Sequence, residues 1–153
     1  MVGLPAPQLD DDIRDIIQVA MPGTASFLER HEWLKHGTCH RAAGGADAYF
    51  DDMLGVTDAI NASEVGALLA GHVGGTVRTA DIRAAFDAAF GPGAGERVQV
   101  HCTGDGGRTL VQELKINLKG AITPQTPLGE LMLAADPTSP GCPEGVIDPA
   151  GLQ

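Results

Sequence analysis

HEWLKHGTC, residues 31–39, is the stretch from which the fold and the function of this chain are best inferred. Two imidazoles, a carboxylate and an ammonium group fall within its first six positions, those of His31, Glu32, Lys35 and His36. Such a density of titratable groups is the usual raw material of proton-transfer chemistry. We therefore take this nonapeptide as the candidate site and the rest of the chain as its support.

The spacing of these residues predicts one helix over residues 26–36. At roughly 100° per residue, His31 stacks on Lys35 and Glu32 on His36, because residues four apart are neighbours on a helix surface. The four side chains then share an arc of roughly 140°. The other side of the helix carries three apolar side chains, those of Phe27, Trp33 and Leu34. We expect these to bury against a core while the charged groups face a cleft.

Both ends of this helix carry recognised signals. Ser26 followed by Glu29 has the spacing of a capping box. Gly37 directly follows the last charged residue, where a C-cap glycine is expected. These signals place the boundaries of the helix at residues 26 and 36.

A zinc-protease interpretation of His31-Glu32 fails on spacing. That motif needs a second histidine four positions after the first, but this position is Lys35, and an ammonium group in place of a ligand would repel the metal. The simpler alternative is a solvated helix face, on which Glu32 pairs with Lys35 or His36 as an ordinary surface ion pair. The residues alone leave this alternative open.

The nonapeptide resembles the second conserved active-site segment of the ribonuclease T2 family, the acid, base-non-specific, transferase-type ribonucleases that include the plant S-ribonucleases. Only Leu34 occupies a variable position of that segment. Weaker similarities lie on both sides of the nonapeptide. They are Met21-Pro22, Asp47-Ala48-Tyr49-Phe50, Thr79-Ala80-Asp81-Ile82, Val98-Gln99-Val100-His101-Cys102 and Leu110-Val111-Gln112-Glu113-Leu114. The resemblance covers about residues 20–120 and is most specific in the nonapeptide.

The resemblance implies a role for each titratable group. His36 would be the general base that removes the proton from the ribose 2′-hydroxyl, which then attacks the adjacent phosphorus and releases a 2′,3′-cyclic phosphate. Lys35 and Glu32 would lie beside the pentacovalent phosphorane, Lys35 as a fixed positive charge and Glu32 as a hydrogen-bonding and positioning group. His31 would bind the phosphate or assist the leaving group. The resemblance implies no metal and no other cofactor, and a substrate of single-stranded RNA rather than DNA.

The family's other active-site segment, a strand that supplies the histidine generally assigned as the general acid, has no match in residues 1–30. That stretch contains no histidine. The chain therefore resembles the C-terminal part of a family member, and we expect an N-terminal truncation, a mis-set start or divergence. Three histidines remain as substitutes for the acid, namely His40, His72 and His101. Each has a simpler explanation, as part of a helix terminus, a helix end rich in small residues or a strand.

Length, composition and charge limit the possible functions. The 153 residues have the length of one domain, predicted over residues 1–153, and 43% hydrophobic residues supply its core. Twenty acidic residues against ten basic ones give a net charge of −10, which argues against broad electrostatic binding of nucleic acid. An RNA contact would therefore be local, and with 4% aromatic residues it would offer few stacking platforms for bases.

The sequence has no recognisable targeting or membrane segment. Residues 1–25 lack a basic region followed by an apolar run, so no signal peptide is expected, and no stretch is long enough to span a membrane. The family resemblance implies a secreted or periplasmic protein.

Helical periodicity recurs through the first ninety or so residues. It predicts a short amphipathic helix at Ile13 to Ala20, a helix over residues 46–60, and a third that begins after an N-cap at Ser63 and runs to residue 69. A further helix follows Thr79 as its N-cap. It carries a buried stripe at i,i+4 spacing, formed by Ile82, Phe86 and Phe90.

The period changes to alternation in the second half of the chain. Residues 98–102 and 109–118 alternate apolar and polar side chains, and the turn Gly104-Asp105-Gly106-Gly107 joins them into a β-hairpin. From Ile122 onward six prolines predict an extended or irregular tail with one short apolar segment, residues 128–133.

The three cysteines are an odd number, which fits a protein that has lost a partner cysteine. In the family pattern Cys39 bonds a cysteine upstream of the nonapeptide, and none precedes it here. Cys102 and Cys142 could form a disulfide that ties the proline-rich tail to the hairpin in an oxidising compartment. Three reduced thiols are the alternative, and the sequence leaves both open.

We predict an α+β domain of ribonuclease T2 type, with helices followed by an antiparallel hairpin or small sheet. Its predicted activity is metal-independent endoribonucleolytic transphosphorylation, with His31, Glu32, Lys35 and His36 as the site. One alternative is a non-catalytic or fragmentary relative that keeps a phosphate-binding helix but lacks the roughly 10²–10⁴-fold contribution of a general acid. The other is a structural or interaction protein, in which a partner or a second copy covers the apolar surface left by absent strands.

Overall fold

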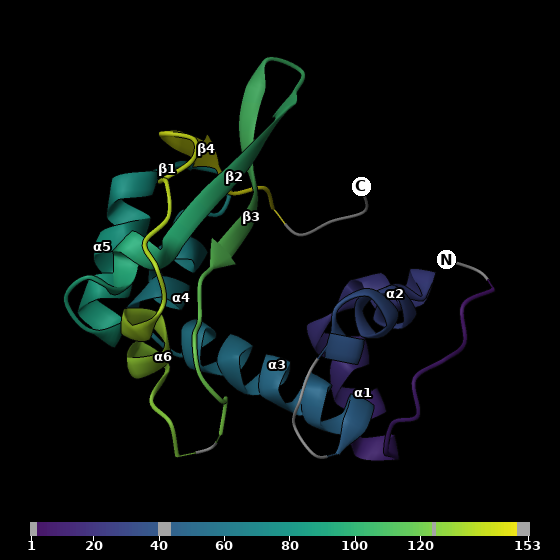
Figure 1. Cartoon of the computed structure of the whole chain (residues 1–153). Helices are drawn as coiled ribbons and strands as arrows, with labels where there is room; N and C mark the ends of the chain where they lie inside the picture. The colour runs from purple at the N-terminus through teal and green to yellow at the C-terminus, as the bar shows by residue number, and fades with distance from the viewer. Residues whose placement is uncertain (1–2, 40–43, 124, 150–153) are drawn as a thin grey trace. The chain divides into compact units, whose positions relative to one another are not determined.

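The computed structural model describes residues 3–39, 44–123 and 125–149. Helices occupy the first half of the chain and most of the sheet comes from the second half, so the fold class is α+β, as predicted (Figure 1). In this described part no helix is both long and apolar enough to cross a membrane. The chain divides into two units, Met1–Thr57 and Asp58–Gln153. A single domain over residues 1–153 stays a prediction.

The first unit packs its helices around a small apolar core. α1 (Asp11–Ala20) turns Ile13 and Ile17 inward at the predicted i,i+4 spacing, and α3 (Gly45–Asn61) contributes Phe50 and Leu54. Around these four residues pack Leu9, Met21, Trp33, Tyr49 and Met53. The core thus anchors the helix that carries the candidate site, because Trp33 belongs to that helix.

α2 (Leu28–Lys35) is shorter than the helix predicted over residues 26–36. Ser26 ends a short 3-10 helix, η1 (Pro22–Ser26), and does not cap α2. The N-cap is Phe27, whose φ of 62° lies in the left-handed region. The predicted capping box is therefore wrong, because the chain changes direction through a left-handed residue between Ser26 and the first helical turn.

Two of the three apolar side chains predicted to be buried on α2 are not. Phe27 is 36% and Leu34 38% exposed, whereas Trp33 packs against the core. Phe27 lies outside the helix, so helical spacing does not bring it to the side that Trp33 occupies. Its ring instead lies under the Arg30 guanidinium, 4.2 Å from the guanidinium carbon to the ring centroid.

The helices of the second unit lie close to their predicted positions. α4 (Glu64–Gly71) begins after the predicted N-cap, since the hydroxyl oxygen of Ser63 accepts a hydrogen bond from the Val65 amide at 3.2 Å. α5 (Thr79–Phe90) buries Ile82 and Phe86 completely, and the Phe90 ring packs against Phe86 with centroids 5.8 Å apart. The apolar segment predicted at residues 128–133 forms α6 (Leu128–Ala134).

Thr79 does not cap α5, contrary to the prediction. Strand β1 (Thr76–Arg78) runs directly into this helix, so Arg78 takes the N-cap position and Thr79 is its first, buried residue. The Thr79 hydroxyl donates to the carbonyl oxygen of Cys142, and its amide donates to that of Pro143 at 2.8 Å. Thr79 therefore binds a distant part of the chain to the start of α5.

The predicted hairpin is formed by β2 (Val98–Asp105) and β3 (Arg108–Ile116) in antiparallel pairing. Its turn is two residues shorter than predicted, because Gly104 and Asp105 still pair with β3. Gly106 and Gly107 have φ values of 54° and 89°, which suits a two-residue turn that needs positive φ at both positions. This requirement explains the glycine-rich tip.

Two strands of the sheet were not predicted. β1 and β4 (Glu144–Val146) pair antiparallel, and β4 pairs parallel with β3 at Leu110 and Val146. The four-stranded sheet of the described residues has the order β1-β4-β3-β2. β4 lies in the tail that its prolines predicted to be extended or irregular. Strands of three residues carry almost no periodic signal and form only because distant strands supply their hydrogen bonds.

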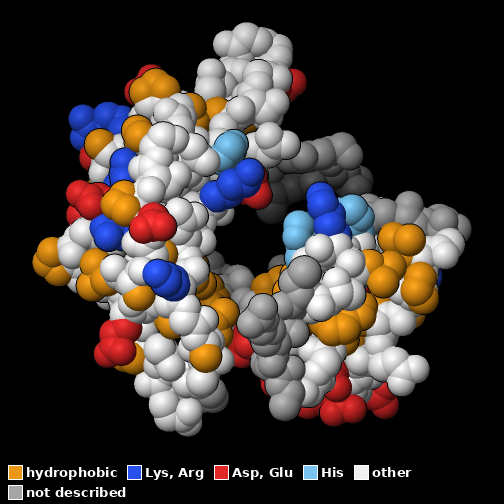
Figure 2. All heavy atoms as spheres, viewed as in Figure 1, with side chains coloured by type: hydrophobic (Ala, Val, Ile, Leu, Met, Phe, Trp, Pro, Cys, Tyr) orange, Lys and Arg blue, Asp and Glu red, His pale blue; other side chains and the backbone are white. Residues whose placement is uncertain are grey.

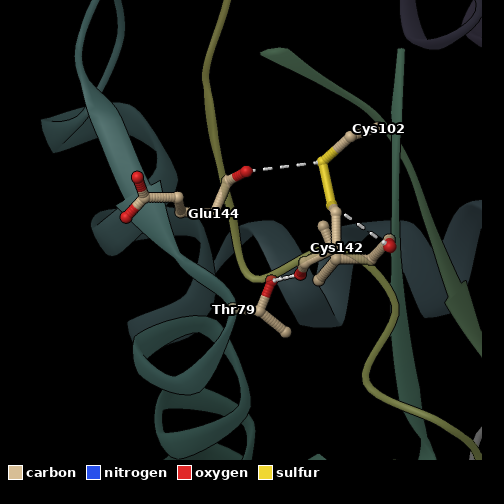
Figure 3. The surroundings of a disulfide bond; sticks show 5 residues. Thr79, Cys102, Cys142 and Glu144 are labelled. Atoms are coloured by element: carbon tan, nitrogen blue, oxygen red, sulfur yellow. Dashed lines mark hydrogen bonds between the residues drawn. A yellow bond between two sulfur atoms is a disulfide. The ribbon is translucent and has the colours of Figure 1, made fainter.

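The structure joins Cys102 and Cys142 in a disulfide, 40 residues apart in sequence (Figure 3). A backbone hydrogen bond lies beside this disulfide. The Cys142 amide donates to the Val100 carbonyl oxygen at 3.1 Å. The segment that leads into β4 is thus tied to β2, as the sequence suggested for an oxidised chain.

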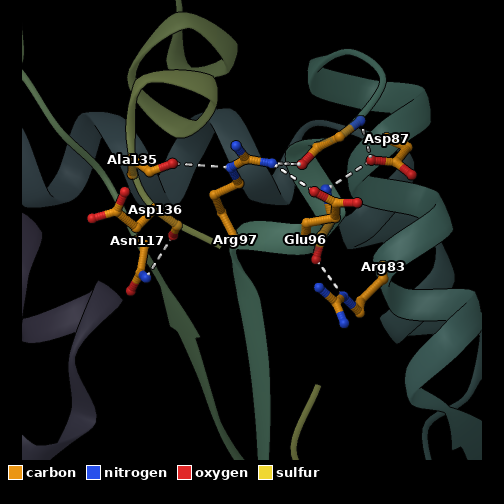
Figure 4. Close-up of polar contacts among 9 residues, drawn as sticks. Arg83, Asp87, Glu96, Arg97, Asn117, Ala135 and Asp136 are labelled. Carbon is orange, nitrogen blue, oxygen red and sulfur yellow. Dashed lines mark hydrogen bonds and ion pairs between the residues drawn. The ribbon is translucent and has the colours of Figure 1, made fainter. Parts of the chain in front are cut away.

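A group of polar contacts fixes the corner between α5, η3 (Ala94–Arg97) and β2 (Figure 4). One Asp87 carboxylate oxygen accepts hydrogen bonds from the amides of Gly93 and Gly95, at 3.0 and 2.8 Å. The Arg97 guanidinium donates to the carbonyl oxygens of Gly93 and Ala135, at 2.9 and 3.1 Å. The start of β2 is therefore held between α5 and the end of α6.

Candidate active site

The four candidate residues lie together at the end of α2. His31, Glu32 and Lys35 belong to the helix, and His36 is its C-cap. Lys35 and His36 are exposed, while His31 and Glu32 are partly buried. Histidine and basic side chains gather at one place on the surface of this unit (Figure 2). The structure thus brings together the four residues predicted to form the site.

Glu32 and His36 are the pair within this group whose side-chain N and O atoms lie within 4 Å of each other. His36 Nε2 lies 3.9 Å from Glu32 Oε2, and the two side chains are 52% and 28% exposed. The rings of His31 and His36 are nearly perpendicular, with centroids 6.4 Å apart. A pair at this distance in water is weak, so the His36 ring remains accessible to a substrate.

Lys35 forms no ion pair with any residue that the structure describes. Its ammonium group balances the charge of the Glu32 carboxylate, in a chain with a net charge of −10 when its histidines are neutral. An ammonium group without an ion-pair partner among the described residues suits an anion such as a phosphodiester.

Trp33 and Tyr49 hold α2 against α3. Their ring centroids are 5.9 Å apart, and Tyr49 in turn contacts Phe50 at 5.0 Å with the rings nearly perpendicular. Burial raises the pKa of the Tyr49 phenol, and the negative charge of Glu32 raises that pKa further. Glu32 is therefore close to Tyr49 as well as to His36. The sequence alone predicts no role for Tyr49 at the site, although Tyr49 lies in a segment that resembles the family.

The titration of Tyr49 tests this placement of Glu32. Tyr49 is the chain's single tyrosine, so the near-ultraviolet absorbance of tyrosinate reports it alone. We expect its pKa above the ordinary value of about 10, and Glu32→Gln is expected to lower it. The raised pKa means that the folded state favours the neutral phenol, so the neutral Tyr49 contributes to the stability of the fold. This contribution is complete below the unfolded-state pKa of Tyr49 and is lost as the pH rises through the folded-state pKa.

The matched control for that titration is Asp12→Asn, which removes the same charge from the exposed first turn of α1. This variant should leave the titration midpoint of Tyr49 where it is in the wild type. If Glu32→Gln also leaves the midpoint unchanged, Glu32 does not lie beside Tyr49.

Gly37 has a different role from the one predicted. Its φ is not positive, and the residue begins a 3-10 helix, η2 (Gly37–Cys39), rather than a left-handed C-cap. A Cβ atom at this buried position would overlap the indole ring of Trp33. The glycine is therefore needed because it leaves room for Trp33.

Gly37→Ala is expected to destabilise the first unit by roughly 1–3 kcal/mol, because the indole must move from its place beside Tyr49. The fluorescence of Trp33, the chain's single tryptophan, measures this during urea unfolding. Gly55→Ala is the control, since a Cβ at this exposed position in α3 meets no atom within 4 Å. Alanine in a helix should stabilise by about 0.5–1 kcal/mol, so equal stabilities of the two variants would contradict this role of Gly37.

The histidines considered as substitutes for the general acid have structural partners where they are described. Nδ1 of His72 lies 2.8 Å from the Leu68 carbonyl oxygen at the end of α4. Nε2 of His101 lies 2.8 Å from Oε1 of Gln99 on β2. His40 lies outside the described residues. Within the described ranges, no group of three or more His, Cys, Asp or Glu side chains could hold a metal ion.

Comparison with known proteins identifies the class to which this fold and this helix belong. A model of the ribonuclease T2 family matches residues 8–126. The chain belongs to the ribonuclease T2 family. It is also 35% identical over 134 residues to ribonuclease I of Escherichia coli (strain K12). That alignment covers 86% of this chain and 48% of the relative, so the chain spans about half the length of the curated protein it matches.

Proposed function

We propose that this chain cleaves single-stranded RNA endonucleolytically at α2, by metal-independent transphosphorylation. The observation that carries the proposal is the arrangement of α2 in a member of a ribonuclease family. Two imidazoles, an ammonium group and a carboxylate lie within six residues, with His36 Nε2 3.9 Å from Glu32 Oε2. These are the groups that a proton transfer at a phosphodiester requires.

The proposed reaction begins with His36, whose ring is exposed enough to reach a bound nucleotide. Its imidazole takes the proton of the ribose 2′-hydroxyl, the 2′-oxygen forms a bond to phosphorus, and the bond from phosphorus to the 5′-oxygen breaks. The products are a 2′,3′-cyclic phosphate and a 5′-hydroxyl, whose proton comes from a general acid. Glu32 stabilises the imidazolium that His36 becomes, because a carboxylate beside it favours the charged ring.

Lys35 and His31 take the remaining roles on α2. Lys35 has no ion-pair partner among the described residues, so its ammonium group is available to the charge that develops on the phosphorane oxygens. His31, with its ring 6.4 Å from that of His36, binds the phosphate or assists the departure of the 5′-oxygen.

A second candidate function is supported by a specific observation. The ammonium group of Lys35 has no ion-pair partner among the described residues and would hold a phosphate whether or not cleavage follows. The alternative is a non-catalytic relative that keeps α2 as a phosphate-binding helix. A structural or interaction role remains a further alternative.

Cleavage of uridylyl-adenosine in the presence of EDTA tests the proposal. The expected products are uridine 2′,3′-cyclic phosphate and adenosine, while the 2′-deoxy dinucleotide should remain intact because it lacks the nucleophile. Lys35→Gln should slow the reaction, whereas Lys119→Gln, which removes the same charge from an exposed residue after β3, should not. No cleavage above background contradicts catalysis by this chain and favours the phosphate-binding alternative.

We further propose a secreted or periplasmic location, which the Cys102–Cys142 disulfide supports, because such bonds persist in oxidising compartments. A homodimer, or a partner that covers apolar surface, stays a prediction. Ile16 and Val19 on α1 are 49% and 84% exposed, which fits such an interface. Gel filtration should then give a dimer, and a monodisperse monomer would contradict it.

A further inference from the structure

One face of the β2–β3 hairpin carries polar side chains that the proposed reaction does not use. Gln99 lies directly opposite Lys115, and His101 directly opposite Glu113. Cross-strand partners project from the same face of a sheet, so these four side chains form a contiguous group. Val98 and Val100, which alternate with Gln99 and His101 along β2, are buried. The polar group therefore occupies the face of the hairpin that does not line the core.

Hydrogen bonds fix the His101 ring in one orientation. The Gln99 side-chain amide donates to the Ser139 hydroxyl at 2.5 Å, while its oxygen lies 2.8 Å from His101 Nε2. An amide oxygen can only accept, so Nε2 of His101 carries the proton in this arrangement. In the neutral ring Nδ1 then keeps its lone pair and can accept a hydrogen bond from a ligand.

The ammonium group of Lys115 is the positive charge of this group, and its ion pair is long and exposed. Its Nζ atom lies 3.7 Å from Oε2 of Glu113, and both side chains are 54% exposed. Arg78 and Arg108, by contrast, bind Asp81 and Asp105 at 2.8 and 2.7 Å. An ion pair as long and exposed as that of Lys115 is weak, so a phosphate can compete with Glu113 for the ammonium group.

We propose that Lys115, His101 and Gln99 form a nucleotide subsite for single-stranded RNA on the second unit. Lys115 binds a phosphodiester, and Nδ1 of His101 accepts a hydrogen bond from an N–H on the edge of a base, in the orientation that Gln99 and Ser139 impose. This inference rests on the proposed function, because it takes RNA as the ligand. It also accounts for how a chain with a net charge of −10 holds a strand, namely by a local contact rather than by a broad basic surface.

Fluorescence anisotropy with a labelled 2′-O-methyl oligouridylate tests the subsite, because this strand keeps its phosphates and base edges but cannot undergo transphosphorylation. Lys115→Gln is expected to weaken binding about 2–5-fold and to reduce the slope of log affinity against log salt by roughly 0.7, the loss of one phosphate contact on a single strand. His101→Ala should also weaken binding.

Glu113→Gln distinguishes the subsite from a loss of folding, because it is expected to strengthen binding by removing the carboxylate that competes for Lys115. Lys119→Gln is the control of equal charge and should change neither the affinity nor the salt slope. Equal losses for Lys115→Gln and Lys119→Gln, or no gain for Glu113→Gln, would overturn the subsite, as would a complete lack of binding.

Failure of the subsite and failure of the proposed function give different results. Binding that depends on Lys115 without any cleavage of uridylyl-adenosine would leave the subsite in place and contradict catalysis. Cleavage of the dinucleotide with no effect of Lys115→Gln or Glu113→Gln on oligonucleotide binding would support the reaction at α2 and contradict the subsite.

Discussion

His36→Ala is expected to cleave uridylyl-adenosine roughly 10²–10⁴-fold more slowly than the wild type, the range that a positioned general base contributes. An alanine cannot take the 2′-hydroxyl proton, while the charge of Lys35 and the packing of Trp33 stay in place. His36 is 52% exposed and is the C-cap of α2, so its loss removes little apolar contact. The decrease should therefore appear in the rate rather than in the stability.

His72→Gln is the matched control for this variant. It replaces a histidine of the second unit whose ring is hydrogen-bonded to the Leu68 carbonyl oxygen. It should cleave the dinucleotide at the wild-type rate. The unfolding midpoint of His36→Ala, followed by Trp33 fluorescence, should match that of the wild type. A His36→Ala variant that keeps the wild-type rate would show that another group acts as the base.

Removal of the disulfide by the double substitution Cys102→Ser and Cys142→Ser is expected to destabilise the second unit by about 2–4 kcal/mol. The bond closes a loop with a sequence separation of 40, and the chain-entropy estimate for such a loop is about 4 kcal/mol. The backbone hydrogen bonds from Cys142 to Val100 and from Thr79 to Pro143 remain. We therefore expect β4 to stay paired in the folded variant. Urea unfolding followed by far-ultraviolet circular dichroism measures the loss.

The wild type under a thiol reductant is the control for the double variant. Reduction should lower the stability of the wild type by a similar amount and leave the double variant unchanged. If reductant affects both proteins equally, the stabilisation comes from elsewhere. If it affects neither, and the two proteins are equally stable, the Cys102–Cys142 bond contributes nothing to the fold.

The family resemblance is strong because the match runs through nine consecutive positions, which include four titratable residues within six positions. The i,i+4 contact of Glu32 with His36 follows from helical spacing alone, so the sequence could predict it. The polar group on the β2–β3 hairpin was not predicted as a site. Gln99, His101 and Lys115 become neighbours only through the register of β2 with β3, and Ser139 reaches Gln99 from 40 residues away.

The sequence by itself determined the α+β class, the helices α1, α3, α4 and α5, the glycine-rich hairpin and the group of charges on α2. These features depend on periodicity, capping and turn residues, which act over a few consecutive positions. Only the tertiary structure decided the strands β1 and β4, the burial of Thr79 against Cys142 and the start of α2 at a left-handed Phe27. It also decided that Gly37 makes room for Trp33. The physical reason is that hydrogen bonds and packing space in these places come from residues distant in sequence, which no local pattern records.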